Sequence, residues 1–334
     1  MSDHHLVTLY HLNDLGSDEL RRLLPGHPDL RITEIGPDED PHDHQEALAD
    51  ATVVLAPLEK ERRITAELLA GMERCRLVQS VAVGFDGVDH RAAAELGIPV
   101  ANLPGFNTDA VADWTVGALL YLVRHHAAGH TKIAEGGWGP EGLRGRDLAA
   151  LTVGIAGFGN IGRAVARRLD AFGSRVLVHD PRPSEPEREY VSLDELASRS
   201  DVLTLHMPLS DATRGLVGDA LLARMDQGSY VVNAGRGGVL DEDALVRALN
   251  SGRLAGAALD VFTEEPLPAG SPLRGRSDVL LNPHTAGVTH EAYHAIRARL
   301  IESLDRVLSG EAPRNVVNGV IVNRAQPIPA ARKG

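Results

Sequence analysis

The sequence of 334 residues contains a single cysteine, Cys75, and no long run of apolar residues. One thiol excludes an internal disulfide and a zinc site built from cysteines. The longest nearly apolar stretch, residues 114–123, is about half of what a membrane-spanning helix needs. The first residues, MSDHHLVTLY, lack a cationic segment followed by an apolar core, so they do not resemble a signal peptide. These absences predict a soluble, cytoplasmic protein in which Cys75 is structural.

Basic residues are also in deficit, because 34 Lys and Arg stand against 46 Asp and Glu, for a formal net charge of −12. This balance argues against nucleic acid and against an anionic membrane as partners. Hydrophobic residues make up 43% of the chain and charged residues 24%, which is typical of folded soluble proteins. The length suggests about two domains.

Short apolar segments alternate with helical patterns, and this alternation predicts parallel sheets covered by helices. Strands are expected first at 5–10, 52–57, 76–83 and 99–102. An apolar stripe with a 3.6-residue period then predicts one helix over 108–130. A second series of strands follows at 151–156, 175–180, 201–206, 229–234, 255–261 and 278–282. Helices are expected between these strands and at 290–310, so the chain reads as two α/β domains.

A glycine-rich turn follows the strand at 151–156 and opens a helix. The turn fits G-x-G-x-x-G and consists of Gly157, Phe158, Gly159, Asn160, Ile161 and Gly162. In this context the glycines permit a tight turn, close approach of a pyrophosphate and close helix packing, while the helix N-terminus offers N–H groups to the anion. Asp180, at the end of the next strand, is suited to bind ribose hydroxyls and to repel a 2′-phosphate. The pattern predicts a dinucleotide site that prefers NAD to NADP, a preference that nearby Arg182 moderates; a turn without a ligand is the plain alternative.

Three further polar residues follow strands of the second series. Arg236 lies in NAGRGG, Glu265 in TEEPLP and His284 in NPHTAG. Taken singly, they read as a surface arginine, a solvated glutamate and a structural histidine. Because carboxyl ends of parallel strands share one edge of a sheet, we expect the three side chains to face one crevice. A histidine with a carboxylate partner and a nearby arginine is suited to acid–base chemistry on a substrate that carries a carboxylate.

With these residues in place, the chain resembles the NAD-dependent D-isomer-specific 2-hydroxyacid dehydrogenase family. The matching segments, in the family's order, are VGFD, NLPGFNTDAVADWTVGALL, GIAGFGNIG, HMPLSDATRGLVG, NAGRGGVLDEDAL, GAALDVFTEEPLP and NPHTAG. The resemblance implies two parallel-sheet domains of Rossmann-like and flavodoxin-like type, with the cofactor domain inserted into the substrate domain. It places the substrate domain at 1–103 and 288–334 and the NAD-binding domain at 104–287.

The resemblance also implies residue roles. Arg236 corresponds to the arginine that binds the substrate carboxylate, His284 to the acid–base and Glu265 to its partner. The amides of Val83 and Gly84 resemble the loop that holds the carboxylate. The remaining cofactor contacts implied are His206 and Pro208 beside the adenine, Thr213 at a phosphate, and Ala234, Arg236, His284 and Asp260 near the nicotinamide, with Asp260 holding its carboxamide.

The family resemblance implies hydride transfer between NAD(H) and C2 of a small 2-oxo or 2-hydroxy acid, with glyoxylate or hydroxypyruvate as the simplest substrates and no metal. It also implies a homodimer, for which the apolar helix at 111–123 is a candidate interface. Lys60, Arg62 and Arg63 either meet a phosphate or second carboxylate of the substrate or are solvated. Two alternatives stay open: a phosphite dehydrogenase-like oxidoreductase and an NAD-sensing, corepressor-like scaffold.

Overall fold

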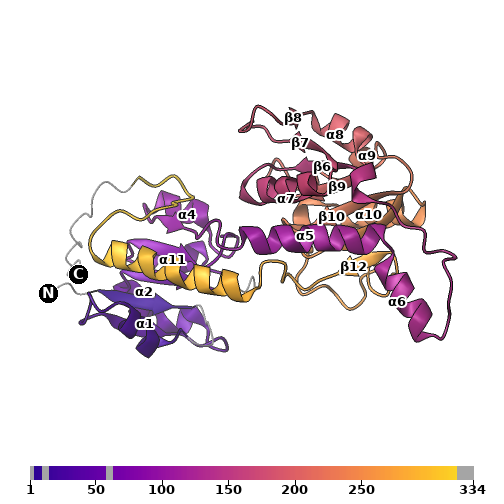
Figure 1. The fold of residues 1–334 in the computed structure, drawn as a ribbon. Coiled ribbons are helices and arrows are strands. Elements are labelled where there is room, and N and C mark those ends of the chain that lie inside the picture. The colour runs from indigo at the N-terminus through magenta and orange to yellow at the C-terminus, as the bar shows by residue number, and fades with distance from the viewer. Residues whose placement is uncertain (1–3, 10–14, 58–62, 322–334) are drawn as a thin grey trace. The chain divides into compact units, whose positions relative to one another are not determined.

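Two compact units divide the chain, of which the computed structural model describes residues 4–9, 15–57 and 63–321. Unit 1 comprises Met1–Phe106 and His290–Gly334, and unit 2 comprises Asn107–Thr289. Unit 2 is therefore inserted in sequence between two segments of unit 1. Each unit contains one all-parallel sheet covered by helices, which confirms the predicted fold class (Figure 1).

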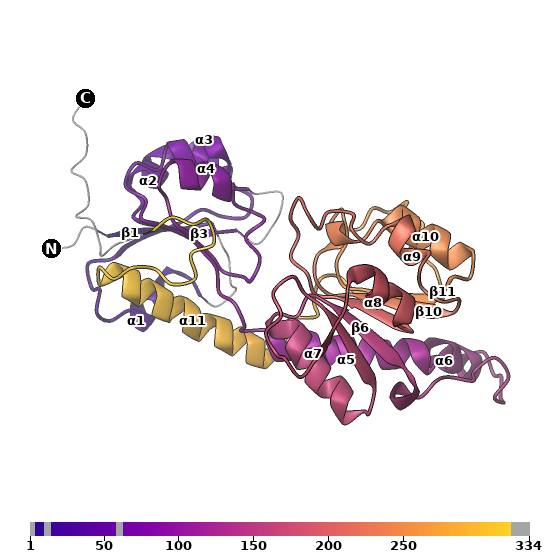
Figure 2. The same cartoon turned by 90° about the horizontal axis from the view of Figure 1, so that it is seen from above.

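Unit 1 is built on a five-stranded sheet with the order β2-β1-β3-β4-β5. Its strands are β1 (His5–Thr8), β2 (Arg31–Glu34), β3 (Val53–Ala56), β4 (Leu77–Ser80) and β5 (Val100–Ala101). Helices α1 (Ser17–Leu23) and α11 (His290–Leu308) lie on one face (Figure 2). The other face carries α2 (Gln45–Asp50), which follows the short helix η1 (Pro41–His44), and α3 (Ala66–Ala70) and α4 (His90–Glu95). Successive residues of β1 serve opposite faces, since Leu6 packs with α1 and α11 and Val7 packs with α2, α3 and α4.

Unit 2 is built on a seven-stranded sheet with the order β12-β11-β10-β9-β6-β7-β8. Its strands are β6 (Thr152–Ala156), β7 (Arg175–His179), β8 (Glu189–Tyr190), β9 (Val202–Leu205), β10 (Ser229–Asn233), β11 (Leu254–Leu259) and β12 (Val279–Leu281). Helices α5 (Thr108–Val123) and α7 (Asn160–Ala171) cover one face. The other face carries α8 (Leu193–Arg199), α9 (Asp219–Leu222) and α10 (Glu242–Asn250). Two short helices, η2 (Leu148–Ala150) and η3 (Gly237–Val239), precede β6 and α10.

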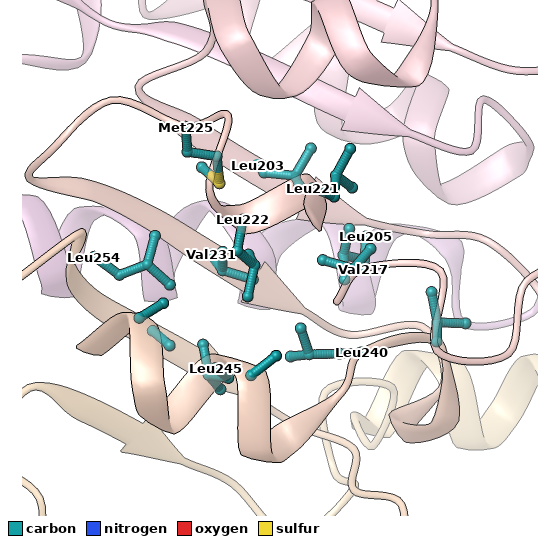
Figure 3. Packing of buried hydrophobic residues seen from close by; sticks show 14 of the residues in the cluster. Leu203, Leu205, Val217, Leu221, Leu222, Met225, Val231, Leu240, Leu245 and Leu254 are labelled. Atoms are coloured by element: carbon teal, nitrogen blue, oxygen red, sulfur yellow. The ribbon is translucent and has the colours of Figure 1, made fainter. Parts of the chain in front are cut away.

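The core of unit 2 explains why its strands read as continuous apolar runs. Both faces of the sheet are covered, so residues of either parity along a strand are buried. Figure 3 shows the layer beneath α9 and α10, where Leu203 and Val231 of neighbouring strands meet Leu221 and Leu245 of the helices. The buried central strands, β6, β9, β10 and β11, give the loops at the carboxyl edge a rigid base.

The helix predicted over 108–130 is two helices, so this prediction is wrong in its continuity. Helix α5 ends at Val123, and α6 (His126–Ala134) begins after His125, which has a left-handed φ of 52°. Neither glycine nor proline marks the break, so the sequence offers no local signal for it. Across the described ranges, none of the helices combines the length and apolarity required to span a bilayer.

The order of the strands shows where unit 2 offers a crevice. Strand β6 has β7 on one side and β9 on the other, so the chain changes its direction of growth across the sheet at β6. Ligands of open parallel sheets bind outside the carboxyl ends of strands at such a switch point. The glycine turn leaves β6 and His206 leaves β9, and both therefore lie at the switch point.

Candidate active site

The glycine turn after β6 is shaped by two different requirements. Gly157 has a φ of 95°, and a Cβ there would lie 2.8 Å from the backbone of His206. A Cβ on Gly162 would overlap the carbonyl oxygen of Gly157. A Cβ on Gly159, in contrast, would meet no described atom within 4 Å. The fold itself thus requires the first and third glycines, whereas the space over Gly159 fits the close approach of a phosphate to the helix N-terminus.

Asp180 lies beside this turn, at the end of β7, and its carboxylate is fixed by the backbone. Oδ2 accepts a hydrogen bond of 2.8 Å from the amide of Phe158, and Oδ1 accepts one of 2.8 Å from the amide of Arg182. Each carboxylate oxygen has a second acceptor position, so Asp180 retains the capacity to bind a ribose diol. The bond to Phe158 also braces the glycine turn, a role that sequence reasoning missed.

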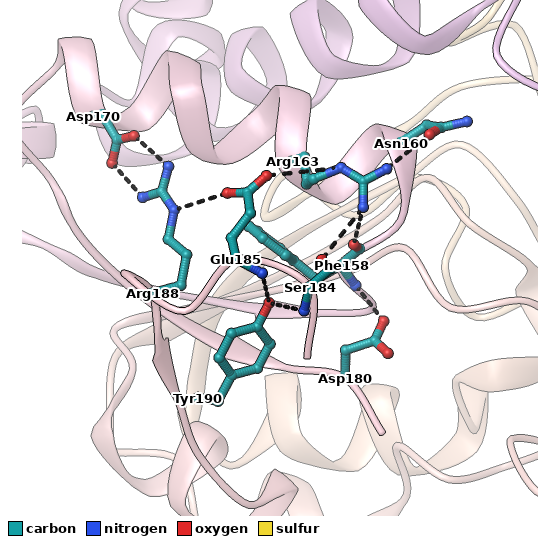
Figure 4. A network of polar contacts seen from close by, with 9 residues as sticks. All are labelled: Phe158, Asn160, Arg163, Asp170, Asp180, Ser184, Glu185, Arg188 and Tyr190. Carbon is teal, nitrogen blue, oxygen red and sulfur yellow. Dashed lines mark hydrogen bonds and ion pairs between the residues drawn. The ribbon is translucent and has the colours of Figure 1, made fainter. Parts of the chain in front are cut away.

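A network of charged side chains holds the segment after Asp180 against α7 (Figure 4). Glu185 lies 3.9 Å from Arg163 of α7 and 3.6 Å from Arg188. Arg188 also pairs with Asp170 of α7 at 2.7 Å, and the hydroxyl of Tyr190 accepts a 3.0 Å bond from the amide of Ser184. The segment that carries Asp180 is therefore tied to the same helix whose N-terminus faces the turn.

The side chains within the glycine turn differ in exposure: Phe158 is buried, Ile161 is half-buried and Asn160 is exposed. The Phe158 ring is 2% exposed and belongs to the core beneath α5 and α7, and Ile161 packs against the same core. The Asn160 Oδ1 accepts a 2.9 Å bond from Arg163. Phe158 and Ile161 therefore anchor the turn in the core, whereas the Asn160 side chain is exposed beside the helix N-terminus.

His206 directly follows β9 and is half-buried. Its Nε2 lies 2.9 Å from the hydroxyl of Thr204, and its Nδ1 is buried without a partner among the residues described. Burial lowers the pKa of His206 to about 4, so the ring is neutral at neutral pH. A neutral ring at the switch point is suited to the apolar edge of a base and not to a phosphate.

Pro208 and Thr213 lie in the exposed turn that follows His206. The Thr213 hydroxyl donates a 2.7 Å bond to the carbonyl of Pro208 and accepts a 2.8 Å bond from the amide of Ser210. The hydroxyl thus stabilises its own turn, and a phosphate contact through it requires that this bond to Pro208 be exchanged.

Arg236 follows β10 on a loop that the backbone fixes closely. The buried Asn233 donates to the carbonyl of Arg236 at 3.1 Å and accepts from the amide of Gly235 at 3.1 Å. On the other side, a Cβ on Gly237 would overlap the backbone of Phe262. Sequence reasoning missed Asn233 and Phe262; the asparagine and glycines around Arg236 in NAGRGG are the signal that pointed to them.

His284 and Glu265, 19 residues apart in sequence, are in direct contact. The His284 Nδ1 lies 2.9 Å from Oε2 of Glu265, and Oε1 of Glu265 accepts a 2.9 Å bond from the amide of Phe262. The Glu265 side chain is 17% exposed and that of His284 is 46% exposed. Because the carboxylate holds Nδ1 as a donor, Nε2 is the nitrogen suited to exchange a proton with a ligand.

Asp260, at the end of β11, holds the turn that carries His284. It is 2% exposed, and its Oδ1 accepts bonds from the amides of Thr285 at 2.8 Å and Ala286 at 3.0 Å. Its own carbonyl accepts a 2.8 Å bond from the amide of His284, which has a left-handed φ of 56°. Ala234, which follows β10, packs against Ala286 of this turn and against Val111 of α5. Asp260 thus fixes an unusual backbone conformation at His284, a role that the sequence did not indicate.

Val83 and Gly84 belong to unit 1, where they follow β4. The carbonyl of Val83 accepts a 2.6 Å bond from Nδ2 of Asn102, and that of Gly84 accepts a 2.6 Å bond from the hydroxyl of Ser80. Of the cations considered for substrate contact, Lys60 and Arg62 lie outside the described residues, and Arg63 is exposed.

Cys75 donates from Sγ to the carbonyl of Leu77 at 3.4 Å. Burial raises the pKa of its thiol to about 12, which disfavours the reactive thiolate at neutral pH and is consistent with the structural role expected from the sequence. Within residues 4–9, 15–57 and 63–321, no group of three or more His, Cys, Asp or Glu side chains is arranged to hold a metal ion.

Several known proteins are similar to this chain in sequence. A family model described as the NAD-binding domain of D-isomer specific 2-hydroxyacid dehydrogenases matches residues 116–286. The chain is 40% identical to a glyoxylate reductase of Aeropyrum pernix, over 79% of this chain and 83% of that protein. It is 33% identical to a hydroxypyruvate reductase of Thermotoga maritima, over 89% and 97%.

A solved structure supports the same relationship. The crystal structure of a glyoxylate reductase from Paecilomyes thermophila superposes with a TM-score of 0.86 at 28% identity, covering 95% of this chain and 99% of that one. The fold, the matched NAD-binding domain and the relatives lead to one conclusion. The chain belongs to the D-isomer specific 2-hydroxyacid dehydrogenase family and is an NAD-dependent oxidoreductase.

Proposed function

We propose that this protein reduces a small 2-oxo acid, glyoxylate or hydroxypyruvate, to the corresponding 2-hydroxy acid, and catalyses the reverse oxidation. The observation that carries the proposal is the 2.9 Å contact of His284 with Glu265 at the same sheet edge as the glycine turn and Arg236. The reductases to which the chain is most similar in the comparisons above are named for these two acids. Both acids carry a small substituent on C2, a hydrogen or a hydroxymethyl group, so they require only a small pocket.

In this proposal Arg236 binds the substrate carboxylate and polarises the neighbouring carbonyl. A guanidinium offers a planar pair of donors that matches a carboxylate, and two close-packed backbone segments fix the start of this side chain. The amides of Val83 and Gly84 in unit 1 provide further donors to the carboxylate. Unit 1 is then the substrate domain and unit 2 the NAD-binding domain.

His284 serves as the acid–base. In reduction, the protonated ring donates the proton on Nε2 to the carbonyl oxygen while a hydride adds to C2, which yields the hydroxy acid and a neutral imidazole. In oxidation the neutral Nε2 removes the hydroxyl proton. Glu265 stabilises the imidazolium through Nδ1 and keeps the ring oriented. Asp260 acts on His284 as a positioning residue, because it holds the turn that presents the ring.

The cofactor assignment follows the geometry of the β6 and β7 ends. The coenzyme supplies the hydride when it is bound. We propose that the backbone of Gly157–Gly162, together with Thr213, binds its phosphates and that Asp180 binds the adenosine ribose. His206 and Pro208 would flank the adenine, and Ala234, Arg236, His284 and Asp260 would surround the nicotinamide.

We also propose a homodimer, for which helix α6 is a second candidate interface beside the predicted one at 111–123. Most apolar side chains of α5 within 111–123 pack in the core of unit 2, whereas Trp114 and Leu120 are only partly buried. Helix α6 has no buried residue. Its Ile133 is 55% exposed, and Trp138, which follows the helix, is 86% exposed. Light scattering should give a dimer mass for the wild type and a monomer mass for a variant with Ile133→Ser and Trp138→Ser. The control is Phe172→Ser, another exposed apolar residue of unit 2.

A cytoplasmic location is proposed because the reaction consumes NADH, which metabolism supplies there. Cell fractionation with an antibody to the protein tests it.

The deciding experiment for the reaction measures NADH oxidation with a panel of acids, repeated with NADPH. The panel contains glyoxylate, hydroxypyruvate, pyruvate, phenylpyruvate, 2-oxoglutarate and phosphohydroxypyruvate. Fast turnover of glyoxylate or hydroxypyruvate with NADH is expected. Turnover of only a larger acid would correct the substrate, phosphite-dependent NAD reduction would indicate phosphite oxidation, and tight NADH binding without any turnover would favour an NAD-sensing scaffold.

A further inference from the structure

The loop after β4 has three successive carbonyl groups that are all held by unit 1. The carbonyl of Ala82 accepts a 2.9 Å bond from the amide of Leu103. The carbonyl of Val83 accepts from Nδ2 of Asn102 at 2.6 Å, and that of Gly84 accepts from Oγ of Ser80 at 2.6 Å. Two of these three donors are side chains, so the loop's conformation depends on residues outside it.

The geometry of the peptide group converts these bonds into a direction for the amides. In a trans peptide the C=O of one residue and the N–H of the next point in opposite directions. The amides of Val83, Gly84 and Phe85 therefore point away from the donors that hold the preceding carbonyls. None of these three amides donates a hydrogen bond to another described residue. Successive outward amides of this kind form a concave site for an anion.

The two side-chain donors are themselves fixed. Gln79, which precedes Ser80 on β4, is 0% exposed. Its Nε2 donates to the carbonyls of Ser80 at 2.9 Å and Ala101 at 3.2 Å, and its Oε1 accepts from Ser303 of α11 at 2.6 Å. The ends of β4 and β5 are thus joined, which keeps Ser80 and Asn102 at a constant distance from the loop.

We infer that Ser80 and Asn102 are positioning residues, which aim the amides of Val83, Gly84 and Phe85 at the carboxylate of the substrate. The inference rests on the proposed function, since that function supplies the carboxylate. It extends the site by a third amide donor, Phe85, and by two side chains that do not touch the substrate. A neutral set of donors suits a small monoanion, because it adds hydrogen bonds without the charge that a phosphate would need.

The test compares variants that remove one donor without adding charge. Ser80→Ala removes the hydroxyl, and Asn102→Leu replaces the amide with an apolar group of similar shape. Asn318→Leu is the matched control, because Asn318 Nδ2 also donates to a backbone carbonyl of unit 1, that of Ile98 at 2.8 Å, away from the loop. Steady-state kinetics with glyoxylate, NADH affinity and thermal stability are measured for each.

Loss of either donor should raise KM for glyoxylate roughly tenfold or more, since small misplacements of binding groups have large effects. The kcat value and the affinity for NADH should change by less than about threefold, because the hydride and proton-transfer groups are untouched. Asn318→Leu should lower thermal stability without this rise in KM. Ser80→Thr, which keeps the hydroxyl, should restore a KM near that of the wild type.

The result that overturns the inference is a KM for Ser80→Ala and Asn102→Leu no higher than that of Asn318→Leu. Binding of oxamate, a monoanion, to the NADH-loaded protein, measured by calorimetry, separates this outcome from failure of the proposed function. If the wild type binds oxamate but reduces no 2-oxo acid, the reaction is wrong, and weaker oxamate binding by the two variants still supports the positioning role. If the wild type neither binds oxamate nor turns over, both proposals fail.

Discussion

The imidazole of His284 has one nitrogen committed to Glu265 and a backbone held in a left-handed conformation by Asp260. Both features orient the ring for proton transfer, whereas most of the proposed coenzyme contacts lie at the glycine turn and Asp180. The His284→Gln variant should therefore lose about 10² to 10⁴ in kcat, the range expected for a missing acid–base. NADH affinity, measured by fluorescence titration, should stay near the wild-type value. An equal loss of kcat and NADH affinity would remove His284 from the acid–base role.

The glycine turn permits a paired test, because two of its glycines are required for different reasons. A methyl group on Gly159 meets open space, so Gly159→Ala should weaken NADH binding at least about tenfold while stability changes by less than about 0.5 kcal/mol. A methyl group on Gly162 overlaps the Gly157 carbonyl, so Gly162→Ala should cost about 2 kcal/mol or more of unfolding free energy. Urea unfolding without ligand and NADH titration separate the two effects. Equal destabilisation by both substitutions would contradict this division.

His206 links stability to pH. Its pKa is lowered from 6.5 to about 4 by burial, so the unfolded chain binds a proton there more readily than the folded protein does. The stability that this pKa difference contributes is fully present above pH 6.5. It is lost as the pH falls toward 4, at up to about 1.4 kcal/mol per pH unit. Urea unfolding at pH 7.5 and pH 5 should show a smaller acid loss for His206→Asn than for the wild type. An identical pH dependence in both proteins would argue against a buried neutral ring.

At the scale of elements, the sequence predicts those strands whose residues are buried on both faces. Strands such as Val53–Ala56 and Val202–Leu205 read as apolar runs because helices cover the sheet. Strand β2, Arg31–Glu34, escaped prediction because it lies at a sheet edge and keeps polar, partly exposed residues. Strand β8, Glu189–Tyr190, is too short to show any period.

The candidate site also has a part that the sequence identifies and a part that it does not. Residues within recognisable motifs, such as Asp180 and His284, could be named from the sequence together with their neighbours. The contacts that fix them could not be predicted, because Asn233, Phe262 and Asp260 act through backbone groups that only the folded chain brings together. Sequence motifs identify groups that meet a ligand, whereas the supporting contacts depend on tertiary packing.

The sequence predicts one helix over 108–130, where the structure has α5 and α6. The residue at the break between them offers a stability test. His125 adopts a φ of 52°, a conformation that costs a residue with a side chain about 1 kcal/mol and glycine little. His125→Gly should raise the urea midpoint by up to about 1 kcal/mol of stability with an unchanged m-value. His130→Gly, at an exposed helical position of α6, should lower stability by about as much. A loss of stability in both variants would be the contrary result.

At the scale of the whole molecule, each unit has its own sheet and its own cores. NADH should bind only unit 2, so the ligand should stabilise the two units unequally. At 100 times the dissociation constant, a bound ligand adds about 2.7 kcal/mol to any opening that releases it. Hydrogen exchange should slow in β6 and α7 on addition of NADH and should change far less in β1 and β3. Equal protection of both units would show that they open as one body. The control is Gly159→Ala, in which weaker NADH binding should reduce the protection.

The distribution of a few rare side chains has a practical consequence. Both tryptophans, Trp114 and Trp138, belong to the inserted unit, and the single thiol, Cys75, belongs to the other. Indole emission therefore follows the unfolding of one half of the chain, while the labelling rate of a thiol reagent follows exposure of the other. The natural sequence thus carries two independent probes, and the order in which its halves unfold is measurable without any engineered label.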